Sequence, residues 1–317
     1  MALPTKMLGR SGLALPPVVL GGNVFGWTAD IKTSLDLLDA ALEGGLNAID
    51  TADMYSTWVE GHEGGESEAI IGAWMKERKN RSQVKILTKV GMAMGHHPAS
   101  LSKARIFAAV EASLTRLQTD YIDLYQAHQD DPETPLEETL GAFAELIKQG
   151  KVKAIGASNY TAPRLKAALD VAKANNLPRY ESLQPLYNLM ERPAFEAELQ
   201  SLCIAEEVGA INYFALAAGF LSGKYKSEAD CVGRRGESAK KYLATAKGKA
   251  VIAALLAQAQ RIGAAPSEVA IAWCREKSGI TAPIASATSL SQMQSLIRAA
   301  ALELDKDSIA ALDEASA

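Results

Sequence analysis

Short apolar runs alternate with longer amphipathic stretches along the chain from Val18 onward. The runs have the length of strands, and their unbroken apolar character is typical of strands that are buried on both faces. Eight runs are predicted strands, at residues 18–20, 46–50, 84–88, 121–127, 152–157, 181–185, 210–214 and 280–284.

The stretches between these runs carry apolar residues three and four positions apart, which is the spacing of the buried face of a helix. They predict helices at residues 33–43, 66–79, 103–117, 136–149, 162–174, 194–207, 249–261 with 267–276, and 291–299. Strands and helices that alternate in this way form parallel sheets with crossover helices. The eight units therefore predict an α/β fold, a (β/α)8 TIM barrel.

Two further elements flank the predicted barrel. Residues 6–8 and 13–15 surround the turn Gly9-Arg10-Ser11-Gly12, which predicts an N-terminal β-hairpin that covers the bottom of the barrel. Residues 301–317 predict an extra C-terminal helix that begins after Asp305 or Asp307. No linker rich in Pro, Gly or Ser interrupts the pattern, so we expect residues 1–317 to form a single domain.

Composition and charge narrow the class of protein. Hydrophobic residues make up 48% of the chain, which suffices for a large core, and the net charge of −4 gives no reason to expect a nucleic-acid partner. Cys203, Cys231 and Cys274 are widely spaced and odd in number, which argues against disulfides and against a metal site. Without an apolar run of about eighteen residues, we expect a cytoplasmic protein with no membrane partner. The oligomeric state stays open.

Candidate chemistry lies at the ends of three consecutive predicted strands. Asp50, Lys89 and His128 each stand at or just past the C-terminal end of such a strand, and Tyr55 follows Asp50 closely. The C-terminal ends of parallel barrel strands share one face, so we expect the four side chains to converge. Each residue alone has an ordinary structural explanation, as a capping aspartate, a loop tyrosine, a surface lysine or a core histidine. Together on one rim they favour a catalytic site.

These four residue types suit proton transfer to a carbonyl oxygen. An ammonium close to a phenol stabilises the phenolate, so we expect Lys89 to move the pKa of Tyr55 down toward the working range. Asp50 would keep Lys89 charged and oriented, because a buried ammonium without a carboxylate loses its proton. His128, neutral and donating a hydrogen bond, would polarise the same substrate oxygen.

Several segments resemble the aldo-keto reductase family. The resemblance is carried by Asp-Thr-Ala-Asp-Met-Tyr at residues 50–55, Leu-Thr-Lys-Val-Gly at 87–91, Asp-Leu-Tyr-Gln-Ala-His at 123–128, Gly-Ala-Ser-Asn at 156–159, Gln184 and Leu-Ser-Gly-Lys-Tyr at 221–225. It implies a barrel that binds a nicotinamide cofactor across its rim and transfers a hydride to a carbonyl carbon. The family's catalytic tetrad would fall on the four residues described above.

The resemblance also implies a set of cofactor contacts. Ser158, Asn159 and Gln184 would bind the carboxamide of the nicotinamide, and Tyr213 would stack on its ring. The implied cofactor-binding residues are Gly22, Asn23, Val24, Asp50, Ser158, Asn159, Gln184, Tyr213, Phe214, Ala215, Leu216, Ala217, Lys224, Arg234, Ser286, Thr288 and Gln292. Residues 213–217 read Tyr-Phe-Ala-Leu-Ala where the family commonly has Tyr-Ser-Pro-Leu-Ala. The segment Gly21-Gly22-Asn23-Val24-Phe25-Gly26 is no dinucleotide fingerprint of a doubly wound sheet.

Two regions bear on the phosphates of the cofactor. Residues 224–249 hold eight basic residues, Lys224 and Arg234 among them, against three acidic ones, which suits a bound anion. Ser286, Thr288 and Gln292 stand at the start of the last barrel helix, where backbone amides attract phosphate. No Arg or Lys occurs between residues 280 and 297, so hydroxyls and a helix end would hold a 2′-phosphate. NADP is the first expectation, and NAD the alternative.

The sequence predicts an NADP-dependent oxidoreductase that interconverts a carbonyl compound and an alcohol, with Tyr55 as general acid and base. Trp27 and Trp58 are expected to line an apolar substrate pocket beside Tyr55 and His128. Substrate and direction are left open. One alternative is a cofactor-binding partner protein like the β subunit of potassium channels, with little turnover. Another is a Schiff-base lyase that uses Lys89 as its nucleophile.

Overall fold

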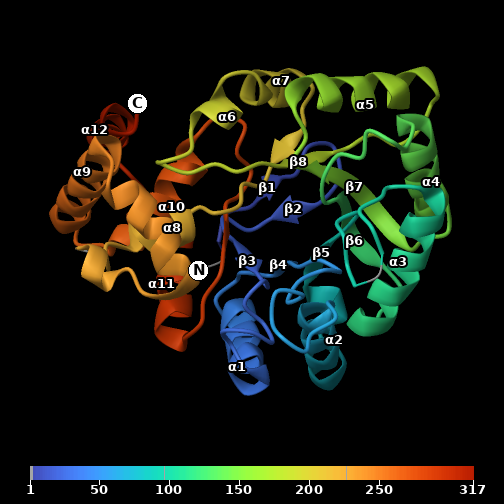
Figure 1. The fold of residues 1–317 in the computed structure, drawn as a ribbon, viewed down its shortest axis with the longest axis horizontal. Helices are drawn as coiled ribbons and strands as arrows, with labels where there is room; N and C mark the ends of the chain where they lie inside the picture. Colours follow the sequence, from blue (N-terminus) through green and yellow to red (C-terminus); the bar gives the residue numbers. More distant parts are fainter. Residues whose placement is uncertain (1–2, 96, 226) are drawn as a thin grey trace.

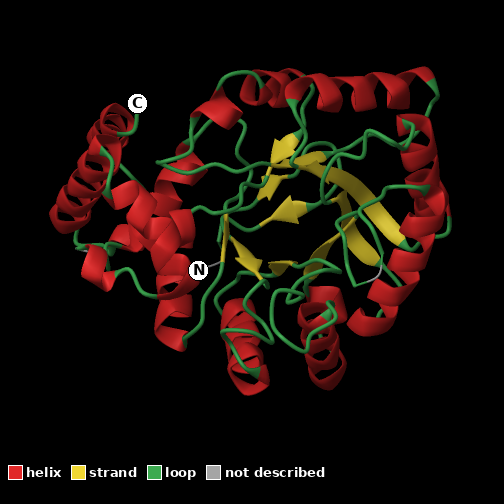
Figure 2. Ribbon diagram, viewed as in Figure 1, coloured by secondary structure: helices red, strands yellow, loops and turns green. Residues whose placement is uncertain are grey.

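The computed structural model describes residues 3–95, 97–225 and 227–317. Eight parallel strands form one curved sheet in the order β10-β3-β4-β5-β6-β7-β8-β9 (Figure 1, Figure 2). The strands are β3 (Val19–Gly21), β4 (Ala48–Asp50), β5 (Lys85–Val90), β6 (Ile122–Ala127), β7 (Val152–Ser158), β8 (Ser182–Gln184), β9 (Gly209–Ala210) and β10 (Ile284–Ala285).

Backbone hydrogen bonds join the two edges of this sheet. Thr281 N donates to Ala210 O at 2.7 Å, and Ile284 N donates to Asn212 O at 2.8 Å. These bonds link the chain around β9 to the chain that leads into β10, as closure of a barrel requires. The predicted (β/α)8 TIM barrel is thus confirmed.

The last two strands are shorter than predicted. Strands were predicted at residues 210–214 and 280–284, but β9 and β10 have only two residues each. Pro283 lies inside the second pattern and has no N–H to donate to a ladder, which explains part of the shortening.

Helices surround the sheet (Figure 2). They are α1 (Ile31–Glu43), α2 (Glu66–Arg78), α3 (Lys103–Leu117), α4 (Leu136–Lys148), α5 (Ala162–Ala174), α6 (Pro193–Glu196), α7 (Leu199–Ala205), α8 (Gly233–Leu243), α9 (Ala246–Ile262), α10 (Pro266–Glu276), α11 (Leu290–Ala301) and α12 (Lys306–Ala315). The side chains of Asp30, Ser102 and Asp305 cap α1, α3 and α12. Such caps satisfy backbone N–H groups that the first helical turn leaves unbonded. The extra C-terminal helix after Asp305 is confirmed.

Two helical regions differ from the prediction. The single helix expected at 194–207 is divided into α6 and α7, because Glu198 takes a non-helical φ of −132°. Helix α8 was not predicted, since its two glycines lower the intrinsic preference for a helix. A Cβ on Gly236 would lie 2.3 Å from the carbonyl carbon of Cys231, so this glycine allows a close backbone approach.

The barrel interior is filled from its N-terminal end. Inward-facing residues such as Leu87 and Leu124 form one apolar cluster with Leu8, Leu13 and Leu15 of the hairpin β1 (Lys6–Met7) and β2 (Ala14–Leu15). The hairpin therefore covers the bottom of the barrel, as predicted. Polar side chains are left for the opposite, C-terminal rim.

In the parts of the chain that the structure describes, no helix is long and apolar enough to cross a membrane.

Candidate active site

The four predicted catalytic residues meet at the C-terminal rim. Asp50 ends β4, Lys89 lies in β5, and His128 directly follows β6. Lys89 comes two residues after Leu87, which points into the barrel, so the two-residue period of a strand turns Lys89 inward as well. All three side chains are buried, and Lys89 is wholly inaccessible to solvent.

Lys89 is the centre of the hydrogen-bond network. Its Nζ donates to Asp50 Oδ1 at 2.6 Å, to Tyr55 OH at 2.8 Å and to the backbone oxygen of Thr51 at 2.8 Å. An ammonium has three donors, so this one is fully used. Tyr55 OH also lies 3.3 Å from Asp50 Oδ1. The Thr51 carbonyl is a contact that the sequence did not reveal, because a backbone acceptor has no residue-type signal.

The pKa of Tyr55 departs from the prediction. Burial raises this pKa well above its ordinary value of 10, and the Asp50 carboxylate adds to the rise by its charge and its hydrogen bond. The expected lowering toward neutrality by Lys89 was therefore wrong. The pKa of Lys89 is itself lowered by burial, against the opposing effect of Asp50. Tyr55 is consequently held as a protonated phenol, which is the form of a proton donor.

His128 has the neutral form that was predicted. Burial lowers its pKa well below 6.5, and the nearby Lys89 lowers it further. The imidazole lies 6.0 Å from the Tyr55 ring, centroid to centroid, at an interplanar angle of 68°. Its Nδ1 is buried and has no hydrogen-bond partner among the described residues. A neutral imidazole and a phenol thus share one side of the rim.

The predicted carboxamide-binding residues form a hydrogen-bonded group. Asn159 Nδ2 donates to the His128 backbone oxygen at 3.0 Å, and Tyr213 OH donates to Asn159 Oδ1 at 2.8 Å. Ser158 Oγ donates to Gln184 O at 3.0 Å. Gln184 Nε2 donates to Asp50 Oδ2 at 2.8 Å, which connects this group to the four predicted catalytic residues.

The structure also places the residues predicted to lie near the phosphates. Ser286 Oγ donates to Asn23 Oδ1 at 2.6 Å, so the ends of β10 and β3 meet here. Thr288 and Gln292 bond to each other at the start of α11, through Thr288 N and Gln292 Oε1 at 2.8 Å. Gly22 N donates to Asp50 O at 2.7 Å.

The loop after β9 has an unusual backbone. Phe214, Ala217 and Ala218 all have positive φ, at 57°, 46° and 56°. This conformation costs energy in residues other than glycine and is concentrated at functional sites. Lys224 packs against Gly219 of the same loop. No pattern in the sequence indicates the left-handed conformation of these two alanines.

The remaining predicted cofactor residues are less accessible. The side chains of Val24, Ala215 and Ala217 are buried in the core, and Leu216 packs against it. Arg234 lies in α8, but its side chain falls outside the described part of the chain.

Two tryptophans stand beside Tyr55. The Trp58 ring lies 5.9 Å from the Tyr55 ring, and Trp27 meets Trp58 edge-on at 5.6 Å. The structure therefore brings together all four residues that were predicted to contact substrate. An aromatic wall of this kind favours apolar compounds.

Comparisons with known proteins agree with the geometry. The model of the aldo/keto reductase family matches residues 17–317. Aldo-keto reductase AFTS1 of Alternaria alternata is 34% identical, over 95% of this chain and 88% of its own length. The uncharacterized oxidoreductase YrpG of Bacillus subtilis is 33% identical, over 97% of this chain and 94% of its own.

A third relative carries a different description. A Schizosaccharomyces pombe protein whose name includes voltage-gated potassium channel subunit beta is 32% identical, over 94% of this chain and 88% of its own. All three similarities extend over nearly the whole barrel. By this coverage and by the family match, the chain belongs to the aldo/keto reductase family and is an oxidoreductase by family.

Proposed function

We propose that this protein is an NADP-dependent oxidoreductase that interconverts an aldehyde or ketone and the corresponding alcohol, with Tyr55 as the general acid and base. The observation that carries the proposal is the buried contact of Lys89 Nζ with Tyr55 OH at 2.8 Å and with Asp50 at 2.6 Å. This arrangement places a proton donor and a cation at one point on the rim.

The rim has the chemistry of a nicotinamide site. Asn159 and Gln184 offer amide groups beside the half-buried ring of Tyr213, which suits a planar ring that carries a carboxamide. Gln126 Nε2 is buried next to them without a hydrogen-bond partner in the described chain. Lys224, Ser286 and the start of α11 would hold the phosphates. No Arg or Lys occurs between residues 280 and 297 to pair with a 2′-phosphate. We nevertheless propose NADP on family grounds, with NAD as the alternative.

Each residue of the tetrad has a distinct part. When bound, the nicotinamide supplies a hydride to the carbonyl carbon in one direction and accepts it in the other. Tyr55 gives its proton to the carbonyl oxygen, and Lys89 stabilises the phenolate that is left. Asp50 keeps Lys89 charged. His128, as a neutral donor, orients the same oxygen, and Trp27 with Trp58 packs against the apolar part of the substrate.

The substitution Tyr55→Phe tests the assigned acid. We expect turnover to fall 10²- to 10⁴-fold, as is typical when a general acid is removed, while nucleotide binding stays near the wild-type value. Tyr160→Phe is the matched control, because it removes a buried hydroxyl whose one hydrogen-bond partner among the described residues is Tyr180 OH, at 3.3 Å. Wild-type turnover in the Tyr55 variant would disprove the role of this residue.

Nucleotide titration tests the cofactor. Quenching of tryptophan fluorescence should show tight binding of NADPH and weak binding of NADH. Equal binding of both would leave the chemistry in place and change the cofactor assignment. Binding of neither would remove the basis of the proposed activity.

A second function is favoured by one comparison, the similarity to a protein named as a potassium channel β subunit. In this reading the protein binds the nucleotide and assists a membrane partner with little turnover. Co-purification with a membrane protein, together with negligible activity on a panel of carbonyl compounds, would support it. Otherwise we propose a cytoplasmic enzyme that acts on a small carbonyl or alcohol substrate, with no nucleic-acid or membrane partner and with its oligomeric state left open.

A further inference from the structure

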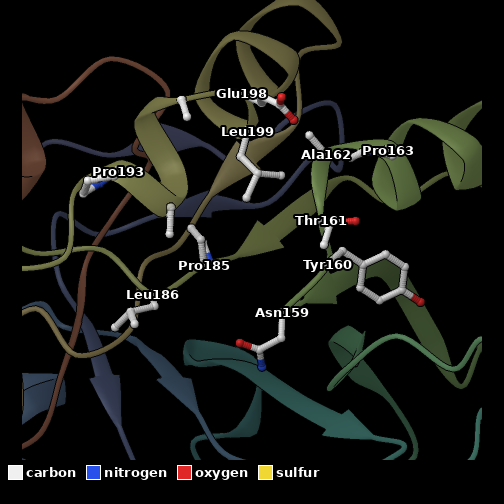
Figure 3. A pocket seen from close by; sticks show the side chains of 12 residues that line it. Asn159, Tyr160, Thr161, Ala162, Pro163, Pro185, Leu186, Pro193, Glu198 and Leu199 are labelled. Carbon is white, nitrogen blue, oxygen red and sulfur yellow. The ribbon is translucent and has the colours of Figure 1, made fainter.

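A cavity of about 400 Å³ lies between the chain that enters α5, the chain that follows β8 and the helices α6 and α7 (Figure 3). Its size falls within the range of small-ligand pockets. Its floor and walls are formed by apolar side chains that include Pro185, Leu186, Ala194, Ala197 and Leu199. It is distinct from the tryptophan wall, whose residues do not line it.

The cavity has a charge preference. Glu198 is the one acidic residue at its edge, and no Lys, Arg or His is among the described residues that line it. The Glu198 side chain is exposed, and its carboxylate forms none of the ion pairs found in the described chain. An apolar cavity with one unpaired carboxylate at its edge favours a cationic ligand and disfavours an anionic one.

Asn159 connects the cavity to the active site. This residue lines the cavity, and its amide group extends away from the cavity toward the strands (Figure 3). Its Nδ2 donates to the His128 backbone oxygen, and its Oδ1 accepts from Tyr213 OH. Its φ of 57° lies in the left-handed region, which Asn adopts more readily than other non-glycine residues.

We propose that this cavity is a second ligand site, which binds a small, mainly apolar amine through the apolar walls and the Glu198 carboxylate. Because the ligand contacts Asn159, its binding changes the affinity of the neighbouring nucleotide site. The coupling to a nucleotide site rests on the proposed function, whereas the amine site does not. By thermodynamic linkage, nucleotide and amine change each other's affinity by the same factor.

Amine binding is tested without nucleotide. 4-Fluorobenzylamine and 4-fluorobenzoate have the same ring and opposite charges, and fluorine NMR line broadening measures the binding of each. We expect a dissociation constant on the order of 1 mM for the amine and weaker binding of the benzoate. Glu198→Gln should weaken amine binding about two- to fivefold, as expected for an exposed ion pair.

Filling the cavity locates the site. Ala197→Trp should abolish amine binding, and Ala194→Phe repeats the test on a different residue if the first variant does not fold. A thermal unfolding midpoint near that of the wild type confirms that each variant is folded. Equal binding of amine and benzoate, or amine binding that survives both variants, would overturn the proposal, as would the absence of amine binding.

The coupling is tested by the dissociation constant of NADPH with and without 20 mM amine, where we expect a change of at least about twofold, absent in Ala197→Trp. An unchanged constant would overturn the coupling and leave the amine site. Failure of NADPH to bind, together with amine binding, would instead count against the proposed oxidoreductase.

Discussion

Two buried aspartates three residues apart have opposite surroundings. Asp50 faces the barrel interior and accepts hydrogen bonds from Lys89, Tyr55 and Gln184. Asp53 lies behind it, where one oxygen meets Arg105 Nη2 at 3.1 Å and the other has no hydrogen-bond partner among the described residues. Both oxygens of Asp50 therefore accept hydrogen bonds, whereas one oxygen of Asp53 has none from the described residues.

The layer behind the four proposed catalytic residues holds several other charges. Glu68 pairs with Arg116 at 2.6 Å and accepts a hydrogen bond from the Thr88 hydroxyl at 2.5 Å. The hydroxyl of Tyr125 is buried there without a partner in the described chain. Thr88 and Lys89 are neighbours on one strand and point to opposite faces, so β5 separates the two networks.

The pKa of Asp53 reflects its weak satisfaction. Burial raises this pKa to about 7, and the charge of Glu68 adds to the rise against Arg105 and Arg116. Lys89 and Tyr125 also interact with Asp53. A group that titrates near neutral pH therefore lies directly behind Lys89, and a pH effect on this protein need not come from the four proposed catalytic residues themselves.

The largest expected effect comes from removing the positive charge of Lys89, which faces the barrel interior. Lys89→Met leaves Asp50 buried without a cation, which typically costs 3–5 kcal/mol, so we expect a loss of that order in the free energy of unfolding. Turnover should fall at least about 10²-fold, because the phenolate of Tyr55 loses its stabilising charge. Urea unfolding and steady-state rates measure the two effects.

Lys153→Met is the matched control for this substitution. Lys153 Nζ lies 2.9 Å from the buried Asp123, but the lysine side chain is 49% exposed and Asp123 keeps Arg81 at 2.8 Å, so losing the lysine should cost at most about 1 kcal/mol. Similar losses in both variants would contradict the distinction between a buried lysine and an exposed one.

The next largest effect concerns Asp53, the aspartate in the layer behind Lys89. Because the pKa of Asp53 is about 7 in the folded protein, above the value of about 4 in an unfolded chain, the folded state holds one more proton between these pH values. Its contribution to stability is therefore complete below about pH 4 and is lost as the pH rises to about 7. Asp53→Asn should remove a slope of about 1.4 kcal/mol per pH unit in this window.

Urea unfolding of wild type and Asp53→Asn at several pH values between 4.5 and 8 measures this difference. Both proteins contain the same other titratable groups, so subtracting the two curves isolates the contribution of Asp53. Parallel curves would show that Asp53 does not titrate in this range, and the contrast with Asp50 would then be one of contacts alone.

The sequence predicted the network around Asp50 and Lys89 better than the layer of charges around Asp53. Asp50, Lys89 and His128 follow strand patterns, and the geometry of a parallel barrel brings strand ends together without further information. Asp53 and Arg105 are 52 residues apart and meet because α3, which packs beside β5, brings Arg105 to the loop that follows β4. No periodic pattern marks such a pair.

Other errors have the same origin in packing. The direction of the Tyr55 pKa depends on how deeply the phenol is buried, which a sequence does not contain. Helix α8 packs against α9 and against residues 217–222, and such packing overrides a weak helical preference. The fold class was predictable because eight repeated units carry it, whereas each of these features depends on particular tertiary contacts.

The smallest expected effect concerns the hydroxyl that ties the strand ends together. Ser67 is fully buried, and its Oγ donates to Gly22 O at 2.8 Å and accepts from Thr51 Oγ1 at 2.9 Å. Ser67→Ala should cost about 1–2 kcal/mol, because the Thr51 hydroxyl loses this buried acceptor and Gly22 O, which keeps the bond from Phe25 N, loses one of its two donors. The substitution does not remove the hydrogen bond between the Thr51 carbonyl and Lys89, so we expect turnover to change only a few-fold.

Ser11→Ala provides the comparison for Ser67→Ala, since the Ser11 hydroxyl also makes one donated and one accepted bond, to Leu8 O at 2.6 Å and from Leu13 N at 3.0 Å. Ser11 lies in the hairpin at the other end of the barrel and is only partly buried, so water can replace its bonds and the loss of stability should be smaller. A fall in turnover with Ser11→Ala as large as that with Ser67→Ala would mean that both substitutions act through general stability. A fall confined to Ser67→Ala would show that the strand ends of β3 and β4 hold the Thr51 carbonyl in place for Lys89.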